Sequence, residues 1–563
     1  MRMNRNVESH FGHIATKEIR RSKFKRDCSH KTTMNTGKIT PIYVDEVLPG
    51  DTVKMHVDEL IRMTTPIYPV MDNAWIDTYF FFVPRRLVWE HWREFMGENR
   101  TDAWTQETEY TIPQLIAPEG GWNKDSLAAR LGARMNTDNI SIDACYTRAY
   151  TLIFNEWFRN QNVTEPAEIS LGDADTTGSN GTDYVTDLQK GGALADAVKY
   201  ADYFTRALPE PQKGPDVYLP LGSTAPVYAG DLRNEHLPYP EYKNIYFDTL
   251  VTDEQGNTTW EPWTGTAGQL HQLVINTNTA GGELLANSST TTYANSKQLT
   301  PNNLYADLAN ANGATINQLR QAFAVQRMYE LDARGGTRYI EILATHFGVN
   351  SPDGRQQRPE YLGGKRVPIN MSQVIQNSST DATTPQGNTA GMSLTIDNHD
   401  CFTKSFTEHG ILMGLAVIRT EHTYQQGIPR ILSRKSRTDF YWPALANIGE
   451  MYIKNKEIYA QGTSEDDEAF GYQEAWAEYR YGINRISGEL NSDYTTPLDS
   501  WTYADKYTEL PTLSDEWIRE TDTNVARTLA INSQDQFIAD FYFDQTWTRP
   551  MPIYSIPSLT GWN

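Results

Sequence analysis

The sequence predicts a mainly β protein of the Greek-key or jelly-roll kind, with long loops between its strands. The clearest strand patterns lie near the two ends of the 563-residue chain, so strands that share a sheet must pair across long connections. Eight strands of about six residues would use only about 50 residues. Most of the chain would therefore form loops, some of them carrying helices.

Two strands are expected in the first hundred residues. Apolar residues alternate with polar ones over 52–58, after a Pro-Gly-Asp turn, which is the period-2 pattern of a half-buried strand. The second strand is expected over 75–83, where three consecutive phenylalanines favour a strand over a short surface helix. Pro84 ends it.

Three further strands are expected late in the chain. Phe537, Ala539, Phe541 and Phe543 alternate with polar residues and predict a strand with one aromatic face. A neighbouring pair of strands is expected over 402–409 and 411–420. These strands would pair with the early ones and so close the β fold.

Four helices are expected in the loops. Thr315 followed by Gln318 forms a capping box, and apolar spacings of three and four then predict a helix up to Arg334, where Gly335-Gly336 stops it. The other helices are expected over 337–347, 86–96 and 142–159.

The stretch 263–313 differs from its surroundings in composition. Thr, Asn, Ala, Gly and Ser dominate it, and only Glu283, Lys297 and Asp307 are charged. Disordered tails usually carry a high net charge, so this stretch predicts an ordered, polar, β-prone insertion.

Charge divides the chain into a basic start and an acidic body. Residues 1–40 hold ten cations against three anions, a net charge of +7, whereas the whole chain carries -21. Five of these cations, together with Phe24, lie within seven residues, where cations suit phosphates and a ring can stack on a base. The cluster predicts a DNA-binding site at Arg20, Arg21, Lys23, Lys25 and Arg26, and a solvated terminus without a partner is the alternative.

No motif for catalysis or metal binding stands out. Gly364-Lys365 lacks the preceding glycine and the following hydroxyl residue of a phosphate-binding loop. The Glu-His pairs at 235, 408 and 421 lack a second histidine four residues on, and the calcium-like start at Asp173 lacks its last ligand. The three cysteines form no CxxC pair. The sequence therefore predicts no catalytic residues, no metal and no cofactor.

The longest apolar run, 410–418, is about half the length that a membrane-spanning helix needs. With a polar, charged N-terminus, this predicts a soluble protein without membrane insertion, made inside a cell.

Long stretches resemble the major capsid proteins of gokushoviruses, small icosahedral single-stranded DNA bacteriophages of the Microviridae. The resemblance rests on stretches that occur in family order from residue 21 to residue 481, among them RSKFKRD (21–27), PIYVDEVLPGDT (41–52), MDNAWIDTYFFFVPRRLVW (71–89), LDARGGTRYIEILATHFGV (331–349) and TYQQGIPRILSRKSRTDFYWPALANIGE (423–450). The match is poorest over 165–200 and 235–313, where the family varies.

The resemblance implies an eight-stranded antiparallel jelly roll of the viral capsid type. The implied parts are a basic internal arm (1–45), the first part of the jelly roll with loop insertions (46–234), a variable protruding insertion (235–313) and the second part with helical loops (314–563). One chain would occupy each icosahedral asymmetric unit of a virion assembled in the host cytoplasm.

The implied partners are further copies of the chain in an icosahedral shell, the single-stranded DNA genome, other virion or scaffolding proteins and a bacterial host surface receptor. Composition alone leaves two rivals. A carbohydrate-active or carbohydrate-binding jelly-roll protein would suit the 14 Trp and 31 Tyr but not the basic cluster. A cytoplasmic single-stranded DNA-binding protein would suit the cluster but not the acidic body.

Overall fold

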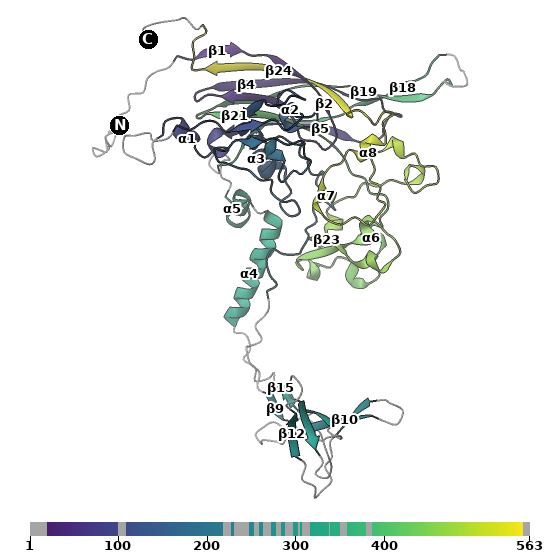
Figure 1. The fold of residues 1–563 in the computed structure, drawn as a ribbon. Coiled ribbons are helices and arrows are strands. Elements are labelled where there is room, and N and C mark those ends of the chain that lie inside the picture. Colours follow the sequence, from purple (N-terminus) through teal and green to yellow (C-terminus); the bar gives the residue numbers. More distant parts are fainter. Residues whose placement is uncertain are drawn as a thin grey trace, which may run out of the picture. The chain divides into compact units, whose positions relative to one another are not determined.

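The computed structural model describes residues 20–98, 109–217, 316–336, 338–349, 357–378 and 385–554, and seven short strands between 227 and 306. The chain forms two compact units: unit 1 comprises Met1–Lys213 and Glu330–Asn563, and unit 2 comprises Gly214–Tyr329. In the described residues the secondary structure is mainly antiparallel β with few helices (Figure 1). This confirms the mainly β class that the strand patterns predict.

The first large sheet of unit 1 joins strands from both ends of the chain. Its strand order is β1-β24-β4-β20, and β2 pairs with β24 beside β1. The strands are β1 (Ser22–Lys25), β2 (Cys28–Met34), β4 (Thr52–Met63), β20 (Thr395–Ser405) and β24 (Phe537–Arg549). Figure 1 shows the purple N-terminal strands beside the yellow β24. Thus the long connections that the sequence predicts do occur.

The second large sheet has the order β16-β5-β21-β3, and β17 also pairs with β5. Its strands are β3 (Thr40–Val47), β5 (Ala74–Pro84), β16 (Glu360–Gly363), β17 (Arg366–Pro368) and β21 (Gly410–Thr420). All its pairings are antiparallel. Successive strands mostly alternate between the two sheets. Each sheet therefore combines strands from early and late parts of unit 1.

One apolar core lies between the two sheets. The strands contribute alternate residues to it, as the period-2 patterns require, and β24 contributes Phe537, Ala539, Phe541, Phe543 and Trp547. These side chains meet residues of β4, β5 and β21 in a single cluster. The aromatic face predicted for 537–543 is therefore the inner face of the first sheet.

Strand β21 is buried along its whole length. Its second face packs against helix α3 (Ala144–Ile153) and the turn Phe154–Phe158, in a cluster with Tyr150 and Phe158. Parallel or fully covered strands read as continuous apolar runs because neither face meets water. The longest apolar run of the sequence is therefore a central strand that is covered on both sides.

Smaller elements surround the two sheets in unit 1. The strands are β6 (Gln114–Ile116), β7 (Ser141–Asp143), β8 (Thr176–Thr177), β18 (Met371–Ile375), β19 (Thr389–Ser393), β22 (Glu450–Lys454) and β23 (Ala469–Glu474). The helices are α1 (Trp92–Phe95), α2 (Leu127–Arg130), α6 (Asn455–Ile458), α7 (Asp515–Ile518) and α8 (Thr523–Ala526). Strands β22 and β23 carry a separate core around Phe204, Phe470 and Trp517.

Unit 2 contains the stretch that the sequence predicts as an ordered β-prone insertion. A five-stranded sheet has the order β11-β10-β14-β13-β12, and β9 pairs with β15. The strands are β9 (Val227–Ala229), β10 (Phe247–Thr252), β11 (Thr258–Pro262), β12 (Gln272–Asn276), β13 (Glu283–Asn287), β14 (Lys297–Pro301) and β15 (Leu304–Ala306). The described part of the insertion is thus β structure, as predicted.

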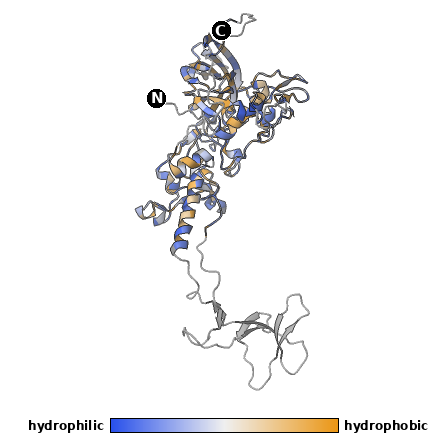
Figure 2. Cartoon of the chain, turned by 90° about the vertical axis from the view of Figure 1, so that its left-hand side faces the viewer, coloured by the Kyte–Doolittle hydropathy of each residue, from blue (hydrophilic) through white to orange (hydrophobic). Residues whose placement is uncertain are grey.

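The predicted strands match β4, β5, β21 and β24, whereas the strand expected over 402–409 overlaps only the last four residues of β20. Two predicted helices match α4 (Ile316–Gly335) and α5 (Tyr339–Phe347), while Thr315 of the capping box lies outside the described residues. Hydrophobic and hydrophilic residues alternate along α4 in Figure 2. The helix expected over 142–159 is largely α3, which begins two residues later because the Asp143 carboxylate accepts a hydrogen bond from the Cys145 N–H at 2.8 Å and caps it.

The prediction of one continuous helix over 86–96 is wrong. The chain forms a 3-10 turn (Arg85–Leu87) and then the short helix α1. The N–H groups of Val88 and Trp89 both donate to the Arg85 carbonyl, and the Trp89 indole donates to Asp173 at 2.6 Å. Trp89 is fully buried, and the next N–H group, that of Glu90, donates to the Leu171 carbonyl at 3.1 Å, which interrupts the helical hydrogen bonds.

The helices in the described residues can also be compared with the length and apolarity that a membrane span needs. None of the helices in them is both long and apolar enough to cross a bilayer.

Candidate nucleic-acid interface

Strand β1 lies at the centre of the basic cluster that the sequence singles out: Lys23 and Lys25 lie on it, Arg20 and Arg21 precede it and Arg26 follows it. Its register against β24 pairs Lys23 with Thr548 and Lys25 with Thr546, on the outer face of the first sheet. Phe24 points to the other face and packs, half-buried, against the core between the sheets. Strand alternation therefore turns this ring toward the core, which speaks against its stacking on a base.

The five cations of the cluster fall into two groups. Arg20, Arg21 and Lys23 are exposed and form no ion pair with the residues that the structure describes. Lys25 pairs with Asp27 at 3.0 Å, and that hydrogen bond and charge raise the pKa of Lys25. Arg26 pairs with Asp45 at 2.7 Å and lies 4.9 Å above the Trp547 ring. Three cations are thus free for a ligand, and two already have intramolecular partners.

Further charged residues continue this outer face. The register places Lys31 opposite Asp540, Lys54 opposite Thr546 and Arg62 opposite Ile538. Lys31 lies 3.3 Å from Asp540, and His56 lies 3.0 Å from Asp400. Carboxylates thus accompany some of the cations on this face, whereas Lys54 and Arg62 form no ion pair with the described residues.

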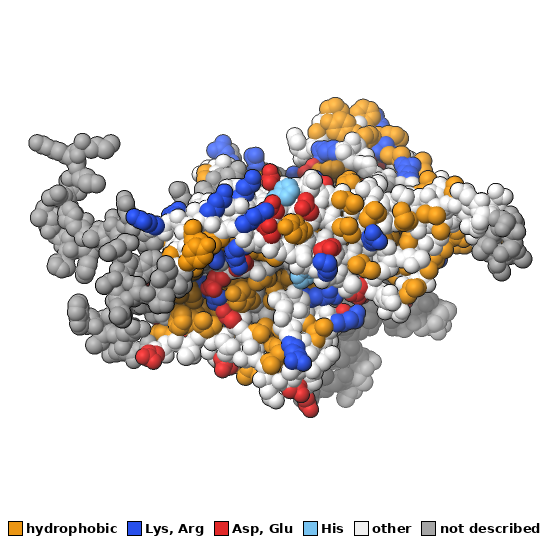
Figure 3. Space-filling view, turned by 90° about the horizontal axis from the view of Figure 1, so that it is seen from above, with side chains coloured by type: hydrophobic (Ala, Val, Ile, Leu, Met, Phe, Trp, Pro, Cys, Tyr) orange, Lys and Arg blue, Asp and Glu red, His pale blue; other side chains and the backbone are white. Residues whose placement is uncertain are grey.

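Apolar side chains share the same face. Leu60, Ile396, Ile538 and Tyr542 are all more than a third exposed. Figure 3, which looks onto this face, shows Lys and Arg beside Asp and Glu on its left half and a group of hydrophobic side chains on its right half. A mixed surface of this kind offers cations to phosphates and flat apolar groups to bases.

Sequence reasoning missed Tyr542 as a ring on this face. The alternation of β24 contained the signal, because Phe541 and Phe543 face inward and the residue between them must face outward. Lys31 and Lys54 were missed because single charges on a strand stand out only once its pairing is known.

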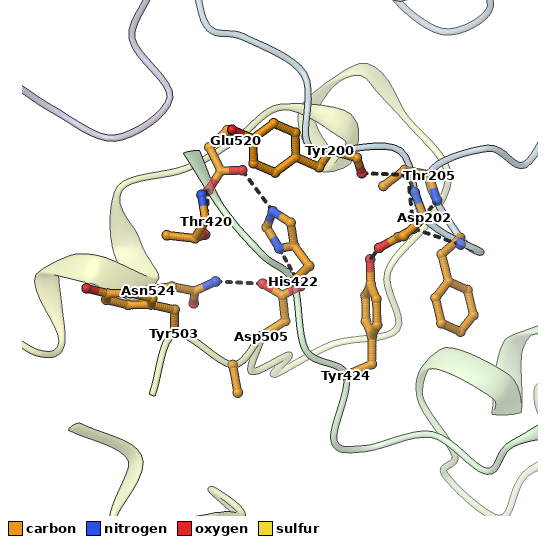
Figure 4. Close-up of polar contacts among 12 residues, drawn as sticks. Tyr200, Asp202, Thr205, Thr420, His422, Tyr424, Tyr503, Asp505, Glu520 and Asn524 are labelled. Atoms are coloured by element: carbon orange, nitrogen blue, oxygen red, sulfur yellow. Dashed lines mark hydrogen bonds and ion pairs between the residues drawn. The ribbon is translucent and has the colours of Figure 1, made fainter. Parts of the chain in front are cut away.

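A cluster of buried charges lies elsewhere in unit 1, around His422 (Figure 4). Its two ring nitrogens lie 2.8 Å from the carboxylates of Asp505 and Glu520. Burial alone would lower the pKa of His422, but the two carboxylates outweigh it and raise the pKa to about 10. Since the imidazolium stays charged near neutral pH, it cannot accept a proton as a general base, and the arrangement is a structural clamp.

This clamp ties together three distant parts of the chain. His422 follows β21, Asp505 also accepts from Asn524, and Glu520 accepts from the hydroxyl of Thr420. In Figure 4 the three side chains converge from separate segments. Removing one partner would leave a buried charge uncompensated, which is the costly case for buried ion pairs.

The calcium-like residues of the sequence also have structural partners. Asp173 accepts from the Trp89 indole and lies 2.9 Å from the His91 ring, and Asp175 accepts from the Gln114 N–H. Within the described residues no group of three or more His, Cys, Asp or Glu side chains is arranged to hold a metal ion.

The chain resembles known proteins along nearly its whole length. The model of the family described as capsid protein (F protein) matches residues 12–559. The capsid protein VP1 of Spiroplasma virus 4 is 42% identical over 539 residues, 94% of each chain. The capsid proteins VP1 of Bdellovibrio phage phiMH2K (40%, 99% of each chain) and Chlamydia phage 1 (39%, 98% of each chain) are similarly related.

Proposed function

The chain belongs to the capsid protein (F protein) family, and on this premise we propose that its copies close into an icosahedral shell around a single-stranded DNA genome. It is a structural major capsid protein and a component of the virion, so copies of it contact one another in a capsid. The proposal adds the icosahedral geometry, with one chain per asymmetric unit, and the nature of the genome.

We infer that the two large sheets form an eight-stranded jelly roll. The strand orders β2-β24-β4-β20 and β3-β21-β5-β16 support this, because they interleave early and late strands across two facing sheets. Strands β1 and β2 pair with successive parts of the same edge of β24, and β16 and β17 do the same along β5. Eight strand positions therefore account for all the strands of the two sheets.

The single observation that carries the shell proposal is the family match over almost the entire chain. The test is expression of the chain, with scaffolding or other virion proteins supplied where needed, followed by sedimentation and electron microscopy. The expected result is a closed particle of shell size. A chain that stays monomeric under every such condition would contradict the proposal.

We propose that the outer face of the first sheet faces the genome. The free cations at β1 and the exposed Tyr542 support this face, since they suit phosphates and bases respectively. The contacts would carry no sequence preference, because cations on phosphates position a strand without reading its bases. Assembly in the host cytoplasm and transient scaffolding partners belong to the same proposal, as does the absence of a catalytic role.

We propose that the insertion within unit 2 contacts a host surface receptor. Within it the stretch 263–313 is polar and carries only Glu283, Lys297 and Asp307 as charges, and unit 2 has a β-sheet of its own; both observations support a separate recognition element. Recognition would rest on hydrogen bonds and shape, so salt would affect it weakly. Trimming 281–298 should leave particles assembling and reduce their adsorption to host cells. Unchanged adsorption of trimmed particles would remove this role and leave an architectural one.

A further inference from the structure

The segment 428–452, with Tyr479 beside it, exposes an unusual amount of apolar surface. We refer to these residues as the arginine–aromatic strip. Its exposed members are large apolar or aromatic side chains, each at least 40% exposed: Ile428, Ile431, Leu432, Phe440, Tyr441, Trp442, Ile448, Tyr452 and Tyr479. Monomeric soluble proteins rarely expose contiguous apolar patches of more than a few hundred Å², and larger ones mark interaction sites.

Arginines lie against the rings of the strip. The Arg434 guanidinium lies 5.0 Å from the Phe440 ring and 4.8 Å from the Tyr479 ring. The Arg437 guanidinium lies 4.5 Å from the Trp442 ring. Arg434 is itself nearly buried and lies 3.1 Å from the Glu478 carboxylate. One side of each of these rings is therefore covered within the chain, while the ring remains 40% or more exposed.

Hydrogen bonds fix the backbone of the strip. Asp439 accepts from the N–H groups of Lys435 and Ser436 at 2.7 Å each, and the Trp442 indole donates to the Arg437 carbonyl at 3.0 Å. The Trp476 indole donates to the Leu445 carbonyl at 2.8 Å. The exposed rings are thus held in place before any partner arrives, which lowers the entropic cost of binding.

The composition of the strip matches the centre of a protein interface. Tyr, Trp, Phe and Arg are enriched in interfaces and supply most binding hot spots, whereas Lys and Glu are depleted. A nucleic-acid site would instead consist mainly of unpaired cations, whereas Arg430 and Arg434 already pair with Glu457 and Glu478, and the exposed surface of the strip is mainly apolar. The observations favour a protein partner.

Charge identifies the partner as a second copy of the chain. Of the four cations in 430–437, Lys435 and Arg437 are exposed and form no ion pair within the described residues, while the whole chain carries a net charge of -21. A basic strip and an acidic remainder are complementary between copies of the same molecule. We propose that the arginine–aromatic strip docks on an acidic surface of a second copy and forms a contact between subunits of the shell.

This inference rests on the proposed shell and names one of its contacts. The test substitutes Leu432, which is 70% exposed, and compares Leu432→Asp with Met71→Asp, a control position that is 76% exposed outside the strip. Both variants should unfold at the temperature of the wild type, because exposed substitutions change stability little. Leu432→Asp should reduce the yield of particles at least tenfold, and Met71→Asp should not.

Oxidative footprinting of the unmodified chain gives a second measurement that does not depend on the folding of any variant. Phe440, Tyr441 and Trp442 should be oxidised several-fold more slowly in particles than in the unassembled chain. Normal particles from Leu432→Asp, or equal oxidation in both states, would overturn the inference. Protection that appears only when another virion protein is added would assign the strip to that protein. A wild-type chain that never forms particles would instead contradict the proposed function.

Discussion

Two segments of the chain combine clustered cations with aromatic rings, and they arrange them in opposite ways. In 20–26 the ring of Phe24 is packed against the core, and three of the five exposed cations form no ion pair with the described residues. In 430–442 the rings are exposed and the guanidinium groups lie on them or pair with a carboxylate. Similar residue types are therefore arranged to suit the two different partners that we propose, because free cations suit phosphates and arginine-backed rings suit proteins.

The largest expected effect is a difference in stability between two arginine variants, one from each segment. Arg434→Ala should destabilise unit 1 by about 3–5 kcal/mol, because it leaves the nearly buried Glu478 carboxylate unpaired. Arg21→Ala should change stability by less than about 0.5 kcal/mol, since Arg21 is exposed. Chemical denaturation of both variants provides the measurement. An equal loss of stability in the two variants would mean that Arg21 contributes as much to the fold as Arg434 does.

The second prediction concerns the rings. Phe24→Ala should cost about 1–3 kcal/mol, less than for a fully buried phenylalanine, because Phe24 is half-buried against the core. It should leave the affinity for single-stranded DNA unchanged at fixed salt. Tyr542→Ala, on the exposed face, is the matched variant and should weaken DNA binding with little effect on unfolding. If Phe24→Ala lost DNA affinity while its unfolding free energy stayed that of the wild type, Phe24 would be a base-stacking residue.

The third prediction separates the free cations from the paired ones. Replacing Arg20, Arg21 and Lys23 with alanine should reduce the log-log salt slope for single-stranded DNA by about 2, at about 0.7 per phosphate. If all five cations of the cluster bound phosphates, together they would contribute about 3.5 to this slope. Replacing Lys25 and Arg26, which pair with Asp27 and Asp45, should change the slope less. Titrations at several salt concentrations, and the genome content of particles, provide the measurements.

Two other outcomes of these titrations would contradict the prediction. If the Lys25 and Arg26 pair reduced the slope more than the triple replacement, the ion pairs to Asp27 and Asp45 would have to break on DNA binding. If neither replacement changed the slope or the genome content, the arm would not be a DNA contact.

Much of the fold could be predicted from the sequence, because strands with one buried face repeat with period 2. The aromatic alternation of β24 and the polar alternation of β4 are examples. Short edge strands such as β1 and β17 could not be predicted, since their pairing with β24 and β5 depends on distant residues. The helix expected over 86–96 failed for the same reason, because the contact of Trp89 with Asp173 overrides the local pattern.

The candidate site was predicted in part. Charge counting found the cations of β1, but it could not tell that Lys25 and Arg26 have carboxylate partners, one of which lies on β3. The arginine–aromatic strip gave no signal, because a sequence with many apolar residues does not reveal which of them stay exposed. Leu432 and Phe82 are both apolar, yet one is 70% exposed and the other 5%.

The smallest expected effect tests whether the strip is fixed before binding. The N–H groups of Ser436 and Lys435 donate to the Asp439 carboxylate, and these bonds lower its pKa to about 2. Because the folded pKa is depressed below the usual value near 3.9, the bonds are complete above about pH 4 and are lost as the pH falls through about 2. Asp439→Ala should therefore speed hydrogen exchange of these two amides several-fold at neutral pH without changing the unfolding temperature. Amides at 20–23, which have no such acceptor among the described side chains, should exchange equally fast in both proteins. Unchanged exchange at Lys435 and Ser436 would show that the strip is not held by Asp439, and its order would then have to come from the rings and the Trp442 indole alone.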